Sequence, residues 1–276
     1  MKFLILLATL VASLANAEVV VVNIGATTSP TALYAQAYAK NLVAPNKFIS
    51  VKNCQEAVNV VTNESHVVVV VANDIYLQNR KLGTDCSFNI TPKTVIAMSD
   101  AFFEICKRPA STKTFRTPNV RVGRASVHPI REWELDFNYR NQTSVKGIGF
   151  SGSKTVLAAV LNGDVDWGYI ATEIAEPAMQ QGQIECPYDT NSQSRRNLGN
   201  EFAMLNNEYV LKYMLVALTN DNQTLTQIRD AAQNVNFQNY VTSSRHQNFT
   251  YSPTFKDIDK FMTSVKSLNA LLETYK

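Results

Sequence analysis

The sequence predicts an α/β protein of two lobes, each a mostly parallel sheet flanked by helices. Two continuous apolar runs, Val19–Ile24 and Val67–Ala72, have the length of single strands and the composition of strands buried on both faces of a parallel sheet. Segments with helical spacing alternate with strand-like runs over most of the chain. Polar connectors at 107–119 and 187–200 divide these segments into two series, which indicates two lobes.

The first series starts with Val19–Ile24, after which Ser29 is a natural N-cap and Pro30 suits the first turn of a helix. Further strands are predicted at Phe48–Val51, Val67–Ala72, Thr94–Met98 and Phe102–Cys106, with a helix at Gln55–Thr62. The second series has strands at Val120–Gly123, Ser144–Phe150 and Val165–Ile170, with helices at Val127–Phe137 and Ser153–Leu161. The last part holds an apolar segment, Tyr209–Leu218, and helices at Leu225–Asn234, Phe237–Ser243 and Asp257–Tyr275.

The N-terminus has the three parts of a cleavable secretory signal. Lys2 precedes an apolar run from Phe3 to Leu14, and Ala15-Asn16-Ala17 follows as the cleavage site. That run is too short to span a bilayer, which takes about 20 residues. We therefore expect residues 1–17 to be removed and the mature protein to be soluble and secreted, in the periplasm or outside the cell.

Charge and cysteine content restrict the possible partners. The formal net charge of +3 includes Lys2 of the signal, and no basic run is present, so we expect no nucleic acid partner. In an exported chain the four cysteines favour disulfides, with three possible connectivities. No C-x-x-C pair is present and the histidines are far apart, so we expect no metal and no cofactor. Five N-x-Ser/Thr sequons leave glycosylation and a eukaryotic or bacterial origin open.

Three glycines, Gly147, Gly149 and Gly152, have the G-x-G-x-x-G spacing of a dinucleotide-binding turn. A dinucleotide turn needs its glycines after the strand, whereas Gly147 and Gly149 fall inside the strand-like run. The Walker pattern also fails, because Ser153 intervenes before Lys154. The segment is instead predicted to be a strand followed by a helix start.

Three helix starts are rich in hydroxyl groups: Thr27-Thr28-Ser29, Arg124-Ala125-Ser126 and Ser151-Gly152-Ser153. Free backbone N–H groups and the helix dipole at such starts favour an anion or a polar acceptor. The first start belongs to the first series and the other two to the second. Their distribution predicts a binding cleft between two lobes.

Residues 150–170, FSGSKTVLAAVLNGDVDWGYI, resemble the second-lobe signature of type 2 periplasmic solute-binding proteins. Among these, the receptors of tripartite tricarboxylate transporters are the nearest, with support from VRVGRASVH at 120–128 and MQQGQIECPYD at 179–189. The phosphonate-binding type is the runner-up. The chain has Gly25-Ala26-Thr27-Thr28-Ser29-Pro30 where the tricarboxylate receptors have a Pro-Gly-Gly loop.

The resemblance implies a division into lobe one, 18–107 plus 196–276, and lobe two, 108–195, joined by a hinge of two crossover segments. It also implies a preferred pairing of the cysteines. Cys106 and Cys186 lie just before the two connectors, so they are expected to form a bridge across the hinge, with Cys54–Cys86 inside lobe one.

Taken with the helix starts, the resemblance implies a non-catalytic protein that closes its lobes over a small polar or anionic ligand, such as a carboxylate. We expect a monomer that acts as receptor for uptake, with a membrane transporter as its partner. Asn73 and Asp74 follow a buried strand, Arg124 offers a bidentate contact to an anion, and Asp166 and Tyr169 are placed at the mouth of a strand. The full predicted set is Thr27, Thr28, Ser29, Asn73, Asp74, Arg124, Ser126, Ser151, Gly152, Ser153, Asp166 and Tyr169.

Other functions remain open from the sequence. The ligand is a phosphonate or phosphate if the runner-up resemblance holds, and the same fold serves as a sensor or a structural protein without a transporter. A secreted hydrolase is a further alternative, with His128 near Ser126 as base and nucleophile. No G-x-S-x-G elbow supports that alternative.

Overall fold

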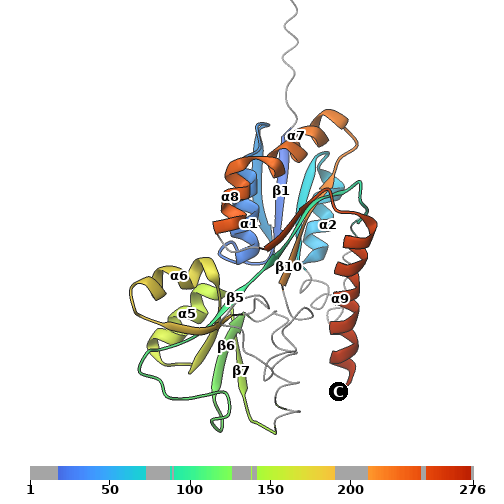
Figure 1. Cartoon of the computed structure of the whole chain (residues 1–276). Coiled ribbons are helices and arrows are strands. Elements are labelled where there is room, and N and C mark those ends of the chain that lie inside the picture. The colour runs from blue at the N-terminus through green and yellow to red at the C-terminus, as the bar shows by residue number, and fades with distance from the viewer. Residues whose placement is uncertain are drawn as a thin grey trace, which may run out of the picture.

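A computed structural model describes residues 18–72, 88, 90–125, 138, 142–189, 211–243 and 247–274 of the 276-residue chain. The predicted signal at 1–17 and the predicted helix at 127–137 lie outside these residues. In the described part, none of the helices has the length and apolar character needed to cross a membrane. Two sheets with helices packed against them make up the fold (Figure 1).

The first sheet has six strands in the order β11-β4-β10-β3-β1-β2. Their bounds are β1 (Val19–Ile24), β2 (Asn46–Val51), β3 (Val67–Ala72), β4 (Val95–Ala101), β10 (Leu211–Leu218) and β11 (Gln247–Tyr251). β1 pairs in parallel with β2 and β3, whereas the β3–β10, β10–β4 and β4–β11 pairs are antiparallel. This sheet is therefore mixed rather than mostly parallel. β10 lies between β4 and β3 and is antiparallel to both.

The second sheet has five strands in the order β7-β6-β8-β5-β9. They are β5 (Phe103–Lys107), β6 (Arg121–Ala125), β7 (Lys146–Phe150), β8 (Trp167–Ala171) and β9 (Glu185–Asp189). β6 is parallel to β7 and β8, and β5 is antiparallel to both β8 and β9. This sheet is also mixed. The two-lobe α/β fold predicted from the sequence is confirmed, with more antiparallel pairing than expected.

Each sheet carries its own helices and its own apolar core. With the first sheet lie α1 (Pro30–Ala39), α2 (Cys54–Asn63), α7 (Asn222–Gln233), α8 (Val235–Ser243) and α9 (Phe255–Thr274). With the second lie α5 (Ser153–Asn162) and α6 (Thr172–Gln180). The valines of β1 and β3 are buried in the first core, as their continuous apolar runs predict. Ser29 caps α1 and Pro30 begins it, so both predictions for this helix start are confirmed.

The chain passes from the first sheet to the second at Phe102, between the end of β4 and the start of β5. The sequence placed this crossover after Lys107, because the apolar run of β5 resembles the strands before it. β5 instead pairs with β8 and β9. The described lobes thus meet five residues earlier in the chain than the resemblance implied.

Cys106 and Cys186 form a disulfide, with Cα atoms 4.0 Å apart, so this predicted pairing is confirmed. The bridge does not cross the hinge, however. Cys106 lies in β5 and Cys186 in β9, which are neighbouring strands of the second sheet. It therefore closes most of lobe two into one covalent loop. The other predicted pairing, Cys54–Cys86, stays a prediction, because Cys86 lies outside the described residues.

Candidate functional site

The carboxyl ends of the parallel strands in both sheets lie at the crossover. In the first sheet Ala101, the last residue of β4, pairs with Leu211, and two residues further along β10 Tyr213 pairs with Ala72 at the end of β3. In the second sheet Phe103, just after the crossover, pairs with Ala171 at the end of β8. The two carboxyl edges therefore face each other across Phe102 (Figure 1). In open α/β sheets this is the edge at which ligands bind.

The start of α6 contacts both lobes at this edge. Thr172 donates a hydrogen bond from its hydroxyl to the carbonyl of Phe102, over 3.3 Å. Ile174 packs against the cores of both sheets. A change in the angle between the lobes would therefore alter the contacts of the first turn of α6.

In lobe one, the predicted loop after β1 offers the hydroxyl groups of Thr27 and Thr28, whose side chains are exposed. Ser29 is already engaged, because its Oγ accepts the N–H of Ala32 at 3.2 Å as the helix cap. The turn depends on Gly25, whose φ of 128° is strained for any other residue. Two of the three predicted hydroxyl groups are thus available to a ligand.

Asn23, near the end of β1, is hydrogen-bonded to this loop. Its side chain is fully buried and its Nδ2 donates to the carbonyl of Gly25 at 3.3 Å and to Ser50 Oγ at 3.0 Å. The amide therefore ties the β1 turn to the end of β2. Sequence reasoning missed this residue, because an asparagine within an apolar run carries no sign of what it contacts.

In lobe two, the two serines of the loop before α5 have different surroundings. Ser151 is exposed, and its Oγ lies 3.3 Å from Thr155 Oγ1. Ser153 is 1% exposed, and its Oγ accepts the N–H of Ala171 at 3.1 Å. Ser153 thus ties the start of α5 to the end of β8. Gly152 is the N-cap of α5, and Ser151 is the outward hydroxyl.

Arg124 lies one residue before the end of β6 and is only 9% exposed. The sequence predicted a bidentate contact from Arg124 to an anion. A guanidinium this buried needs acceptors around it, because an unpaired buried charge is strongly unfavourable. Ser126, Asn73 and Asp74 were also predicted to line the site, and they lie outside the described residues.

Asp166 does not lie at the carboxyl edge. It precedes β8, and its carboxylate accepts hydrogen bonds from Lys113 Nζ at 2.8 Å, from the Arg121 N–H at 2.9 Å and from Arg121 Nη2 at 3.4 Å. Burial alone would raise the pKa of Asp166, but the bonds from Lys113 and Arg121 outweigh it and lower the pKa. This residue therefore joins β6, β8 and the connector after β5 at the amino end of the sheet.

Tyr169 also departs from its predicted position at the mouth of a strand. It is the central residue of β8, pairs with Ile105 and is 1% exposed. The sequence predicted that this strand ends at Ile170. The strand in fact continues to Ala171, so Tyr169 lies inside it and not at its end. Thus Asp166 and Tyr169 are part of the framework of lobe two.

Glu173, in the first turn of α6, was missed by the sequence reasoning. Its Oε1 is buried without a hydrogen-bond partner. Burial raises the pKa of Glu173 to about 7, against the lowering effect of its own backbone N–H. A carboxyl group with such a pKa at a carboxyl edge is a typical feature of a functional site. An acidic residue three positions after the predicted strand Val165–Ile170 was the available signal.

No metal centre is formed by the part of the chain that the structure describes, since no three His, Cys, Asp or Glu side chains there could hold an ion together. The available chemistry at the carboxyl edge is that of hydroxyl groups, backbone N–H groups, a guanidinium and a carboxyl group. These groups recognise small polar or anionic molecules.

No protein-family model and no curated protein matches the sequence. Solved structures do match. The adipate complex of Rpa4515 from R. palustris is 14% identical, with a TM-score of 0.70 over 94% of this chain and 97% of that chain. A TctC solute-binding protein from Polaromonas is 12% identical, with a TM-score of 0.60 over 93% and 98%. PhnD1 of Prochlorococcus marinus, in complex with methylphosphonate, is 14% identical, with a TM-score of 0.55 over 92% and 99%.

Two of these neighbours, the TctC solute-binding protein and PhnD1 with methylphosphonate, correspond to the two types that the sequence resembles. The chain has the two-lobe fold of periplasmic solute-binding proteins. The predicted resemblance is therefore confirmed for the fold, and the tricarboxylate-receptor and phosphonate-binding types are both represented among its structural neighbours.

Proposed function

We propose that the protein is a solute-binding protein that closes its two lobes over a small carboxylate at the carboxyl edges of the sheets. The observation that carries this proposal is the meeting of both carboxyl edges at Phe102, with the starts of α1, α5 and α6 along them. The ligand would be held by Thr27 and Thr28 of lobe one and by Ser151, Arg124 and Glu173 of lobe two.

The lobes of this proposal follow the two sheets. Of the described residues, those within 18–101 and 211–274 belong to lobe one, and those within 103–189 belong to lobe two. Closure would turn the lobes about Phe102. Because Thr172 is hydrogen-bonded to Phe102, α6 would move with the hinge.

The site favours an anion that also accepts a hydrogen bond. Arg124 would supply a charge-assisted contact, and the helix start at Ser151 would add N–H groups. Glu173 would donate a hydrogen bond to a ligand carboxylate when it is protonated. A dicarboxylate such as adipate has the required groups and is bound by a neighbour of the same fold. Methylphosphonate, bound by PhnD1, is the second candidate ligand class.

The proposed role is non-catalytic, as a secreted monomeric receptor that hands its solute to a membrane transporter. Turnover of the bound molecule is therefore not expected. A hydrolase based on Ser126 and His128 would show turnover that is lost in His128→Ala, and this outcome would favour the enzyme alternative.

A thermal-unfolding screen tests the proposal. Adipate, malate, methylphosphonate and phosphate are added separately to the purified protein, and a ligand present at 100 times its Kd adds about 2.7 kcal/mol of stability. We expect adipate to raise the midpoint. Ser151→Ala should weaken that rise, whereas Ser243→Ala, which removes an exposed hydroxyl from the end of α8, should leave it unchanged. If none of the four compounds raises the midpoint, the proposal fails.

A further inference from the structure

Two of the five sequons, Asn63-Glu64-Ser65 and Asn222-Gln223-Thr224, lie at the same end of the first sheet. Asn63 is the last residue of α2, four positions before β3 begins at Val67. Asn222 is the first residue of α7, four positions after β10 ends at Leu218. Val67 and Leu218 are paired in the sheet, so the two acceptor asparagines flank one end of it. The side chains of the other three acceptors lie outside the described residues: Asn89, Asn141 and Asn248.

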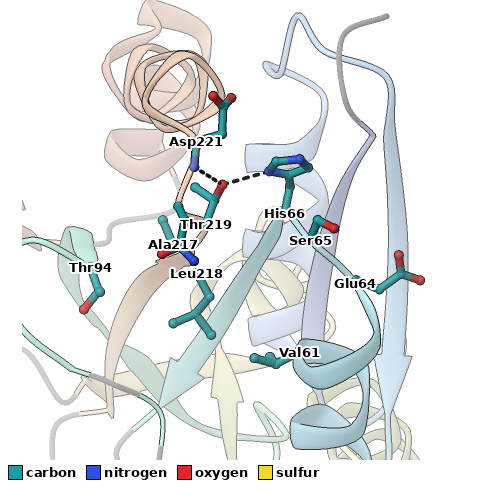
Figure 2. Close-up of a pocket in the computed structure, with 10 residues that line it drawn as sticks. Val61, Glu64, Ser65, His66, Thr94, Ala217, Leu218, Thr219 and Asp221 are labelled. Carbon is teal, nitrogen blue, oxygen red and sulfur yellow. Dashed lines mark hydrogen bonds between the residues drawn. The ribbon is translucent and has the colours of Figure 1, made fainter.

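A polar pocket of about 720 Å³ lies between these two sequons (Figure 2). Glu64 and Ser65 line it from the α2 side, and Asp221, the N-cap of α7, lines it from the α7 side. His66 Nδ1 lies 2.8 Å from Thr219 Oγ1, so the segments that follow α2 and precede α7 are held together here. The hollow leaves space beside both acceptors, whereas a packed neighbour would exclude a bulky sugar.

Both acceptor side chains are exposed. The Asn63 amide donates a hydrogen bond from Nδ2 to the Asn59 carbonyl at 2.8 Å. A primary amide nitrogen carries two N–H groups, so this bond leaves a second N–H that a bond to a sugar can replace. The middle residues of the two sequons are Glu64 and Gln223, and neither is the proline that prevents glycosylation. A glycan is bulky and solvated, so the folded chain can carry one only at exposed positions such as these.

The two sequons lie far from the proposed carboxylate site. The His66 carbonyl accepts the N–H of Val20 at 2.9 Å, which places this end of the sheet at the amino ends of β1 and β3. Each of these strands has six residues, which separate this end from the carboxyl edge by about 17–20 Å. A glycan on Asn63 or Asn222 would therefore leave the carboxyl edges of the sheets accessible to a ligand.

We propose that Asn63 and Asn222 are acceptors of N-linked glycans in the exported protein. The sugar donor is an oligosaccharide joined through a diphosphate to a membrane lipid. In the transfer, the C–O bond between the first sugar and the diphosphate breaks, and the same carbon bonds to the asparagine Nδ2. The amide nitrogen loses one proton, and the lipid diphosphate leaves with the bonding electron pair. The modification goes beyond the proposed function and rests on the predicted export alone, so either proposal can fail without the other.

Expression of the full chain with its own N-terminal signal in cultured mammalian cells tests this modification. Protein from the medium and from the cells is treated with peptide N-glycosidase in ¹⁸O-water, which releases each glycan and leaves a labelled aspartate in place of its asparagine. We expect mass spectrometry to find the label in the two peptides that contain positions 63 and 222. Recovery of either peptide with an intact asparagine alone would overturn the proposal for that position.

Matched variants separate glycan transfer from spontaneous deamidation. Ser65→Ala keeps the Asn63 acceptor but destroys its sequon, so the label at 63 should be lost, whereas Ser65→Thr should keep it. Asn222→Gln should remove the label at 222 alone. Asn59→Gln, which changes an exposed asparagine of α2 that belongs to no sequon, should leave both glycans in place. A label at 63 that persists in Ser65→Ala would come from deamidation and would overturn the proposal for Asn63.

Discussion

Asp166 and Glu173 are acidic residues at the two ends of one strand, β8, and their surroundings differ. Asp166 is 5% exposed and is surrounded by donors from Lys113 and Arg121, which lower its pKa. Glu173 has a buried oxygen with no hydrogen-bond partner, and burial raises its pKa to about 7. The comparison teaches that the partners of a buried acid decide its role. A carboxylate with donors to both oxygens holds the fold together, whereas a carboxylate with one buried oxygen that lacks a donor is available to a ligand.

Removal of the paired acid should have the largest effect on stability. Asp166→Ala leaves the backbone N–H of Arg121 without its acceptor and removes the counter-charge of Lys113. We expect a loss of about 3 kcal/mol in the free energy of unfolding at pH 7, from urea denaturation. A loss below about 1 kcal/mol would show that the contacts of Asp166 contribute little to the stability of lobe two.

Removal of the Glu173 carboxylate should change the free energy of unfolding in the opposite direction. Glu173→Gln replaces a carboxylate that burial disfavours by a neutral group of the same shape. We expect a gain of about 2 kcal/mol at pH 8, less than the full shift in pKa implies, because the side chain is partly exposed. Glu176→Gln, on the same helix, is the matched control and should change stability by less than about 0.5 kcal/mol. A loss of stability in Glu173→Gln would contradict this account.

The two acids should also give opposite pH profiles. The folded pKa of Glu173, about 7, exceeds its ordinary value of 4.5, so the folded state binds more protons between these values and stability falls as pH rises through this window. The folded pKa of Asp166 lies below 3.8, so its contribution is present above 3.8 and is lost as pH falls through the lowered value. The free energy of unfolding should be measured by urea denaturation from pH 3 to 8. In Glu173→Gln, its decline as pH rises from 4.5 to about 7 should vanish. In Asp166→Asn, its loss as pH falls below 3.8 should be smaller than in the wild type.

The smallest effect should come from Lys113, whose side chain is 47% exposed. Lys113→Met leaves both Arg121 contacts with Asp166 in place. Because solvent screens an ion pair at this exposure, we expect a loss of about 0.5–1 kcal/mol. Measurement in high salt should reduce the difference between Lys113→Met and the wild type. A loss as large as that in Asp166→Ala would mean that Lys113 alone holds the carboxylate.

The sequence predicted those parts of the fold that depend on local pattern. The buried runs of β1 and β3, the cap at Ser29 and the helix α5 are where the sequence placed them. It missed β9 and β11, which are edge strands that pair on one side only and so show little apolar pattern. β9 even contains Pro187, which is tolerated at a sheet edge. Helix α6 was missed as well, and Pro177 lies in its interior.

The candidate site could be predicted only in part, for a related reason. Hydroxyl groups at helix starts are visible in sequence, but whether one faces outward depends on tertiary contacts. The Ser153 hydroxyl accepts the Ala171 N–H and is buried, whereas Ser151 is exposed, although both serines belong to one loop. The same holds for Asp166, whose donors Lys113 and Arg121 come from elements far from it in the chain.

The most direct test is the affinity for adipate at pH 6 and pH 8, measured by calorimetry for the wild type, Glu173→Gln and Asp166→Asn. If protonated Glu173 donates to the ligand, the wild type and Asp166→Asn should both bind about tenfold more weakly at pH 8. Glu173→Gln, which keeps a donor at every pH, should lose that dependence. Unchanged pH dependence in Glu173→Gln, or its loss in Asp166→Asn, would contradict a ligand site at the carboxyl edge of β8.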